Sequence, residues 1–512
     1  MAKNRFWLAF HSDKLYDKKE KYQGKRMEQN MNRLKKILLT PAKFAVDLGD
    51  GSERGSYVNQ DYILQKMHRP HRGINLMYCY YPLDEGWPAR ARDAYADQDV
   101  SFAWDYPYDD YFTYGGGLNG SRDGEPFACM RDVRRHGQDV ILTLTCDPHV
   151  SDEHIIAIAK DLQPFGRMML RVNHEATGSW FSFNKRASYQ EVADFYVRFH
   201  KIIKEYAPNV QTILCIGGIE DPNPDVKEIL YEKEFAEAVR TTDIWSVDKY
   251  MALNWGWPYE VAEKENFQHK RDLVETVYDL TKRSFERFKE LNDGVAKPMV
   301  MSEFNADGDV TGPFDQVKMV QEFCRMVKED KERWFSGLTF YQFRDDGRLG
   351  LEITDPNNAE VGIEQPVLSA YREIINDDFF KPGIEAQEEA SLPVTLRWGG
   401  AEDAEGLSVT LSLEGNPVFA EAYFKDELAE ANLMMELNGR WFYKASGVTF
   451  VDFMPAFFDQ AITGPCEMDL HIFAPPASGE NDPSQGEDWA VNYYYTINAL
   501  PDIRLRFEPI VL

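Results

Sequence analysis

The 512-residue chain predicts an α/β fold, a (β/α)8 TIM barrel, followed by a smaller all-β sandwich. Up to about residue 380, short apolar runs alternate with longer segments of helical periodicity. The runs are rich in Val, Ile, Leu, Met and aromatic residues and lack polar alternation, which is typical of strands buried on both faces of a parallel sheet. Further along, the apolar runs shorten and often alternate with polar residues, which indicates antiparallel strands.

Eight apolar runs fall within the first region. A closed barrel accounts for eight β/α alternations over about 300 residues better than an open doubly wound sheet does. No G-x-G-x-x-G motif follows the first run, which weakens a dinucleotide-binding interpretation. The expected strands are Phe44–Leu48, Ile74–Tyr81, Val140–Thr145, Met168–Val172, Thr212–Ile216, Ile244–Val247, Met299–Met301 and Leu338–Phe343.

Helical spacing of apolar residues predicts the helices between these strands. The clearest are Tyr189–Tyr206, Leu273–Leu291 and Val317–Val327. A further helix is expected near Arg26–Leu39, within an N-terminal extension spanning residues 1–40. The barrel is then assigned to residues 41–380.

One connection, residues 82–122, is unusually long and carries many aromatic residues and a run of three glycines. A loop of this length in a compact domain is usually functional or disordered, and its aromatic content argues against disorder. It follows a predicted strand, so we expect it on the face of the barrel where active sites form.

Residues 385–512 are assigned to the sandwich, with a long loop at 475–487. This domain either binds glycan or braces the barrel; bracing is favoured because no aromatic stripe stands out. The expected strands are Thr395–Trp398, Leu407–Leu413, Phe419–Phe424, Trp441–Ala445, Met468–Phe473, Val491–Ile497 and Ile503–Phe507.

Composition narrows the possible partners. A formal net charge of −28 argues against nucleic acid, anionic membranes and polyanionic glycans, so a neutral substrate fits better. No apolar stretch is long enough to span a membrane, and no signal peptide is evident, so a cytoplasmic protein is expected unless a leader was trimmed. The six cysteines form no C-x-x-C pair and are expected to be free thiols rather than metal ligands. The oligomeric state is left open.

The most informative stretch runs from Arg171 to Phe181, with the sequence RVNHEATGSWF. It closes an apolar strand, so Asn173, His174 and Glu175 should lie at the catalytic end of the barrel, followed by Trp180 and Phe181. A second carboxylate, Glu303, lies in a similar context at the end of the seventh expected strand. An acid, polar neighbours and an aromatic platform are what cleavage of a sugar–sugar bond requires.

Two carboxylates brought together in this way indicate glycoside hydrolysis. Retaining glycosidases hold the two carboxyl groups about 5–5.5 Å apart, one as proton donor and one as nucleophile. The donor needs a raised pKa and the nucleophile must stay ionised, so their surroundings must differ.

The string R-x-x-H-E-x-x-G-x-W-F resembles the fourth-strand signature of glycoside hydrolase family 26, the β-mannanase family of clan GH-A. Ser302-Glu303 is similar to that family's seventh-strand nucleophile motif, and the stretch Asp243–Tyr250 to its sixth strand. The sequence departs from the family at Ala176-Thr177, where Met-Asn is usual, at Phe183 and at Asn305. The resemblance therefore supports the clan and the mechanism better than it supports mannan as the substrate. A separate family of the same clan fits the sequence as well.

The resemblance implies roles for individual residues. Glu175 would be the general acid/base and Glu303 the nucleophile, His174 and Tyr250 would orient Glu303, and Trp180 would floor the sugar site. From the residues themselves, Arg171 is expected to hold the loop by ion pairs, with Asn173 as a polar support. Residues expected to contact substrate are Trp180, Phe181, Trp255, Trp257, Tyr341, Gln342, Asn305 and Asp248.

The leading hypothesis is a retaining β-glycoside hydrolase that acts on a neutral β-linked glycan, β-mannan as first guess, and needs neither cofactor nor metal. Within the same chemistry, an exo-acting enzyme or a transglycosylase on short oligosaccharides is the alternative. A barrel that binds carbohydrate without cleaving it is the rival from another class.

Overall fold

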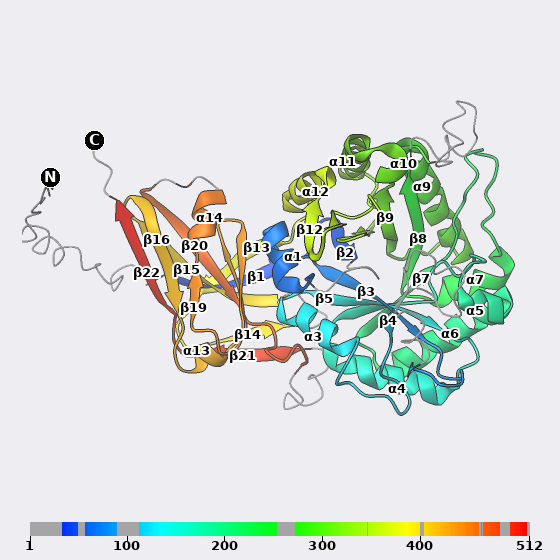
Figure 1. Cartoon of the computed structure of the whole chain (residues 1–512), viewed down its shortest axis with the longest axis horizontal. Helices are drawn as coiled ribbons and strands as arrows, with labels where there is room; N and C mark the ends of the chain where they lie inside the picture. The colour runs from blue at the N-terminus through cyan, green and yellow to red at the C-terminus, as the bar shows by residue number, and fades with distance from the viewer. Residues whose placement is uncertain are drawn as a thin grey trace, which may run out of the picture.

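The computed structural model describes residues 33–49, 57–89, 112–252, 272–345, 347–399, 404–459, 462, 464–481 and 492–508. Figure 1 shows two parts side by side, a barrel ringed by helices and a β-sheet domain. No helix within these ranges is long and apolar enough to cross a membrane.

The barrel consists of eight parallel strands and confirms the predicted (β/α)8 fold. Hydrogen bonding runs in the order β2-β10-β9-β8-β7-β6-β5-β3, and pairing of β2 with β3 closes the ring. All eight predicted strands are present. Their bounds are β2 Ala45–Gly49, β3 Gly73–Tyr80, β5 Asp139–Cys146, β6 Met168–Val172, β7 Val210–Cys215, β8 Ile244–Met251, β9 Met299–Ala306 and β10 Gly337–Phe340.

Each barrel strand is followed by a helix on the outside of the ring (Figure 1). The helices are α1 Gln60–Met67, α3 Phe127–Arg135, α4 Asp152–Leu162, α6 Tyr189–Tyr206, α7 Glu232–Thr241, α9 Val274–Leu291, α11 Pro313–Glu329 and α12 Pro366–Asn376.

Helix α6 shows why these segments fold as the sequence predicts. Ser188 and Glu191 form a capping box at its start, which satisfies backbone donors that the first turn leaves open. Val192, Phe195 and Phe199 recur at helical spacing and are buried against the barrel. Local signals and tertiary burial agree here, so the predicted bounds of this helix are confirmed.

Short elements occupy the connections on the side where the strands end. They are β4 Phe112–Thr113, α5 Ser182–Arg186, α10 Gly308–Thr311 and the hairpin β11 Glu352–Asp355 with β12 Asn358–Glu364. Strand β4 pairs with Tyr78 and Cys79 near the end of β3. Within the long 82–122 connection, residues 90–111 lie outside the described ranges.

The sandwich contains two antiparallel sheets, as predicted. The larger follows the order β13-β1-β15-β20-β17-β18 with β14 and β21 alongside, and the smaller is β19-β16-β22. Their bounds are β1 Leu34–Thr40, β13 Gly383–Glu389, β14 Val394–Trp398, β15 Ala404–Leu413, β16 Asn416–Tyr423, β17 Leu433–Leu437, β18 Arg440–Lys444, β19 Phe450–Asp452, β20 Cys466–Phe473, β21 Tyr493–Ile497 and β22 Asp502–Glu508, with short helices α13 Glu427–Glu430 and α14 Met454–Asp459.

The helix predicted near Arg26–Leu39 is wrong where the structure describes it. Strand β1 occupies Leu34–Thr40 and pairs with β13 and β15, so this part of the expected N-terminal extension belongs to the sandwich sheet. Leu34 packs in the sandwich core, whereas Ile37 packs on the other face with Trp398 and Trp441. A strand buried on both faces produced the three-residue spacing that resembled a helix.

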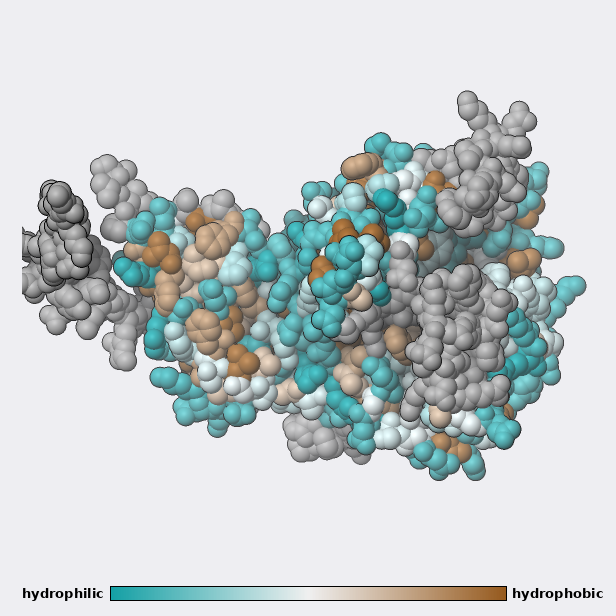
Figure 2. Space-filling model, viewed as in Figure 1, coloured by the Kyte–Doolittle hydropathy of each residue, from teal (hydrophilic) through white to brown (hydrophobic). Residues whose placement is uncertain are grey.

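The sandwich packs against the barrel on the side of α1 and α3. The backbone N–H of Trp441 donates to the carbonyl of His68 at 2.9 Å, and the rings of His136 and Tyr443 lie 3.7 Å apart. Asn432 reaches across to the carbonyl of Arg135. Figure 2 shows mostly polar residues on the visible face of the barrel, with apolar residues gathered in patches on the sandwich.

Replacing Ile37 with Ala should lower the free energy of unfolding by about 2–4 kcal/mol, because it opens a cavity between the sheet and the barrel. Lys35→Ala, on the same strand but partly exposed, should change it by less than about 0.5 kcal/mol. Urea unfolding followed by fluorescence measures both. Equal effects of the two substitutions would contradict the placement of β1.

Candidate active site

Glu175 and Glu303 reach the same end of the barrel from strands three places apart in the ring, with β7 and β8 between them. Glu303 lies within β9, and Glu175 follows β6 by three residues. One carboxylate oxygen from each of Glu175, Asp248 and Glu303 lies within 4.8 Å of the others. The structure therefore brings together the two carboxylates that the sequence paired and adds a third from β8.

The backbone after β6 is unusual at two positions. Asn173 and Glu175 have φ values of 47° and 48°, in the left-handed region that non-glycine residues rarely adopt. The Asn173 side chain locks this turn, because it accepts from the N–H of Cys146 at 2.6 Å and donates to the carbonyl of the same residue at 3.2 Å. Strain of this kind persists where surrounding structure fixes it, commonly at functional sites.

Arg171 is the cation of the cluster. Its guanidinium is buried and donates to Glu303 at 2.9 Å, to Asp248 at 3.2 Å and to the Thr143 hydroxyl at 2.8 Å. This confirms that Arg171 makes ion pairs. Its partners are a proposed catalytic carboxylate and Asp248 rather than the loop.

Glu303 receives donors on both carboxylate oxygens. Arg171 donates to Oε1, and the Tyr250 hydroxyl donates to Oε2 at 2.8 Å. His174 Nε2 lies 3.6 Å from Oε1. Hydrogen bonds from a guanidinium and a phenol stabilise a carboxylate anion.

Glu175 has a different environment. Burial raises its pKa well above the usual range, and the nearby charges of Asp248 and Glu303 raise it further. Arg171 and the indole N–H of Trp180, which donates to Oε2 at 3.1 Å, act in the opposite direction. The balance favours the protonated form of this carboxyl group relative to an exposed glutamate.

His174 does not supply a second positive charge. Burial, followed by the charge of Arg171, lowers the pKa of its imidazole well below the usual range. The ring lies 4.5 Å from that of Phe181. Its approach to Glu303 is therefore that of a neutral ring, not of an ion-pair partner.

Asp248 is enclosed rather than open to substrate. Its side chain is 1% exposed and accepts the backbone N–H of Glu303 at 2.9 Å as well as the Arg171 guanidinium. Burial and the charge of Glu303 raise its pKa to about 7, with Arg171 opposing. The sequence had suggested substrate contact for Asp248, and these contacts instead make it a support for Arg171 and the backbone of Glu303.

Aromatic residues surround the carboxylates. Trp180 is 41% exposed, with Phe181 beside it at a ring distance of 6.0 Å. Tyr341 packs edge-on to Tyr250 at 6.1 Å. One cluster joins Met77 and Cys79 of β3, and Tyr81 directly after it, with Trp87, Phe181 and Tyr341.

Two other expected substrate contacts are buried. Asn305 donates to the carbonyls of Tyr341 and Leu349, so it ties β9 to the segment after β10. Gln342 is 1% exposed and donates to Asp345 at 3.0 Å. Trp255 and Trp257 lie outside the described residues.

The three carboxylates also form a donor set with the spacing of a divalent-cation site. Arg171 already donates to two of them, so a guanidinium compensates their charge. Burial and the mutual repulsion of the carboxylates raise the pKa values of Glu175 and Asp248.

Sequence reasoning missed the support beneath Arg171. Thr143 on β5 accepts from the guanidinium and donates to Asn75 on β3 at 2.8 Å. All three residues are buried inside the barrel. Part of this signal was present in the sequence, since Asn75 interrupts the apolar run of β3 and Thr143 is one of two threonines within β5.

No family model matches the chain, and no curated protein sequence matches it. Solved structures similar in fold include a GH26 β-mannanase from Bacteroides ovatus, with 10% identity, a TM-score of 0.39 and coverage of 66% of this chain and 90% of that one. An α-L-arabinofuranosidase from Thermotoga maritima has 11% identity, a TM-score of 0.43 and coverage of 86% and 98%. A family 1 β-glucosidase from the same organism has 10% identity, a TM-score of 0.41 and coverage of 67% and 94%.

These neighbours are glycoside hydrolases of varied specificity, and family 26, the family that the fourth-strand string resembles, is among them. At this identity the likeness concerns the fold alone. The assignment of activity therefore depends on the geometry of the site.

Arg171→Met should destabilise the protein by about 3 kcal/mol at pH 8, because buried carboxylates lose their cation. The deficit should shrink toward pH 5. Raised pKa values mean that the folded state binds protons more tightly than the unfolded state, so stability falls as pH rises through them, and the loss of Arg171 raises them further.

Thermal unfolding at pH 5 and pH 8 measures this difference. The control is Arg325→Met, which removes an exposed guanidinium paired with Glu322 and Glu329 and should have a small effect at either pH. A deficit that is independent of pH would show that Arg171 acts by packing alone.

Proposed function

We propose that the protein is a retaining β-glycoside hydrolase that acts on a neutral β-linked glycan, with β-mannan as the first candidate. The observation that carries this proposal is the unequal carboxylate pair. Glu175 is set up to hold a proton and Glu303 to carry a charge, and their oxygens lie within 4.8 Å. That spacing supports double displacement, in which the two carboxyl groups lie about 5–5.5 Å apart, over an inverting mechanism, which needs a wider gap.

In the proposed first step, a Glu303 oxygen attacks the anomeric carbon while Glu175 gives its proton to the departing glycosidic oxygen. A glycosyl ester of Glu303 results, and the bond between the sugars breaks. In the second step Glu175, now ionised, takes a proton from water, which attacks the anomeric carbon and frees Glu303. The two proposed steps use only these side chains and water as reacting groups besides the glycan.

The remaining residues support these two steps. Tyr250 and Arg171 hold Glu303 in one orientation through hydrogen bonds to its two oxygens. The half-exposed face of Trp180, beside Glu175, is placed to carry the sugar ring. The strongly acidic surface, with a net charge of −28, favours a neutral glycan over a polyanionic one.

Glu303→Gln and Glu175→Gln should each lower turnover at least about a thousandfold and leave the fold intact. A panel of β-mannan, xylan, β-glucan and galactan, with products resolved by size, measures this. Glu286→Gln, an exposed residue of α9, is the matched control and should retain full activity.

Product sizes separate the possible modes of action. A ladder indicates endo action, and one repeated small product indicates exo action. Binding to one glycan without cleavage by the unaltered protein would contradict the proposal and favour a carbohydrate-binding barrel.

Trp180→Phe keeps an aromatic ring and removes the indole N–H that donates to Glu175. That hydrogen bond lowers the pKa of Glu175, so its loss should raise the pKa and move the alkaline limb of the kcat/KM profile to higher pH. Profiles of the variant and the unaltered protein on one substrate test this. A limb that stays in place or moves to lower pH would show that another group controls it.

A further inference from the structure

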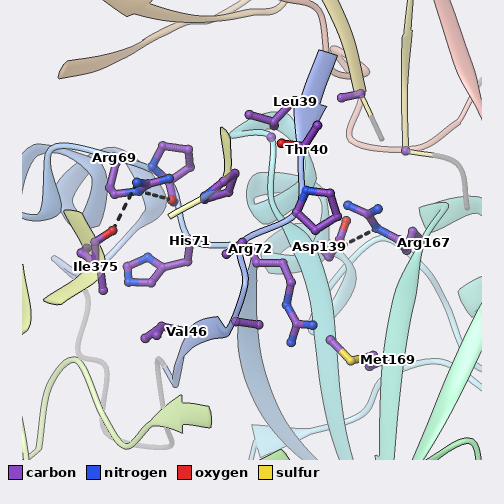
Figure 3. A pocket seen from close by; sticks show the side chains of 18 of the residues that line it. Leu39, Thr40, Val46, Arg69, His71, Arg72, Asp139, Arg167, Met169 and Ile375 are labelled. Atoms are coloured by element: carbon purple, nitrogen blue, oxygen red, sulfur yellow. Dashed lines mark hydrogen bonds and ion pairs between the residues drawn. The ribbon is translucent and has the colours of Figure 1, made fainter. Parts of the chain in front are cut away.

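A cavity of about 390 Å³ lies between the amino-terminal ends of the barrel strands and the sandwich, away from the candidate active site. The loop between β1 and β2 and the starts of several barrel strands line it on one side, and β14, β15, β17 and β18 on the other. Figure 3 shows Arg69 and His71 on one side and the Asp139–Arg167 pair on the opposite side. The volume is that of a small-molecule pocket.

The charged lining of this junction cavity is mainly positive. Arg69, Arg72 and Arg167 face it, against one lining carboxylate, Asp139. This contrasts with a chain whose net charge is −28. Arg72 and Arg167 are paired with Asp47 and Asp139, and their side chains remain 34% and 42% exposed.

Arg69 lacks such a partner. It is 5% exposed, and its guanidinium donates only to the backbone carbonyls of Pro70 and Ile375, at 3.4 and 3.2 Å. No described carboxylate lies within ion-pair distance of it, and the charge of Glu436, farther away, is the main one that favours its ionised form. A buried guanidinium is costly unless a negative charge compensates it.

His71 adds an unused polar atom at the same wall. It is 5% exposed, and its Nε2 is hydrogen-bonded to the Tyr371 hydroxyl at 2.9 Å. Its Nδ1 is buried and has no partner among the described residues. A cation and a free imidazole nitrogen therefore lie on one side of the cavity.

The sandwich supplies apolar walls. Trp398, Trp441 and Met434 line the cavity and belong to one buried cluster. Aromatic residues in the lining suit a ligand with a planar apolar body, and a buried guanidinium suits a negative group at one end of it.

We propose that the junction cavity binds a small organic anion, a carboxylate carried on a planar apolar body, with Arg69 compensating its charge. The carboxylate would take the buried guanidinium of Arg69 as its partner, and the body would lie against the apolar residues of the sandwich. Such a ligand would link the two domains at a face of the barrel that is usually reserved for stability.

Calorimetric titration of the whole protein with 2-naphthoate and its neutral analogue 2-naphthamide tests the proposal. We expect one naphthoate per chain, bound about tenfold or more tightly than the amide, because only the anion gains charge-assisted hydrogen bonds. Equal affinity for the two compounds, or no saturable binding of naphthoate, would overturn the proposal.

Two variants locate the binding. Arg69→Met should weaken naphthoate binding about tenfold and leave the amide unchanged, whereas Arg325→Met, which removes an exposed guanidinium of α11, should alter neither. Ala404→Phe, which fills the cavity from β15, should weaken both ligands. Naphthoate binding that survives both Arg69→Met and Ala404→Phe would place the anion elsewhere and refute the assignment.

Discussion

The candidate active site depends on one buried cation. Arg171 has almost no exposed surface and contacts Thr143, Asp248 and Glu303, so it can remain charged inside the barrel only because carboxylates surround it. Arg171 also makes the environments of the three carboxyl groups unequal. Two of the three carboxylates accept directly from the guanidinium, and the third, Glu175, does not. Protonation therefore falls most readily on Glu175, which is the division that an acid and a nucleophile require.

The fold holds the residues that create this difference in fixed positions. Arg171, Asp248 and Glu303 belong to barrel strands or their ends, and hydrogen bonds from Tyr250 and from the Glu303 backbone fix their relative positions. Glu175 is the exception, since it stands in a left-handed turn beyond β6, which Asn173 locks to β5. The sandwich contacts the opposite end of the barrel and the α1–α3 side, so it stabilises the barrel without covering the site.

Much of this could be predicted from the sequence, because buried parallel strands are apolar along their whole length and the chemistry-bearing residues follow two of them. The limits have physical causes. Strand β1 was mistaken for a helix because Leu34 and Ile37 are buried on opposite faces. Asp248 and Asn305 were expected at the substrate, yet partners from neighbouring strands and loops enclose them. Contacts across strands depend on the order of strands around the ring, which spacing along one chain does not reveal.

The compensation of buried charges differs between the two ends of the barrel. Three arginines of the described residues are fully buried, and two of them have carboxylate partners: Arg171 with Asp248 and Glu303, and Arg134 with Asp139 at 3.1 Å. A buried charge without such a partner is expensive. Arg69 donates only to backbone carbonyls, as the buried Lys444 of the sandwich does, and the charge of Glu436 compensates Arg69 only in part. At the end with the three carboxylates, protonation of a carboxyl group offsets the excess negative charge, and catalysis can use that proton. An unbalanced cation at the other end cannot be resolved in that way, since a guanidinium does not give up its proton near neutral pH, and an anion from solution is the remaining means of compensation.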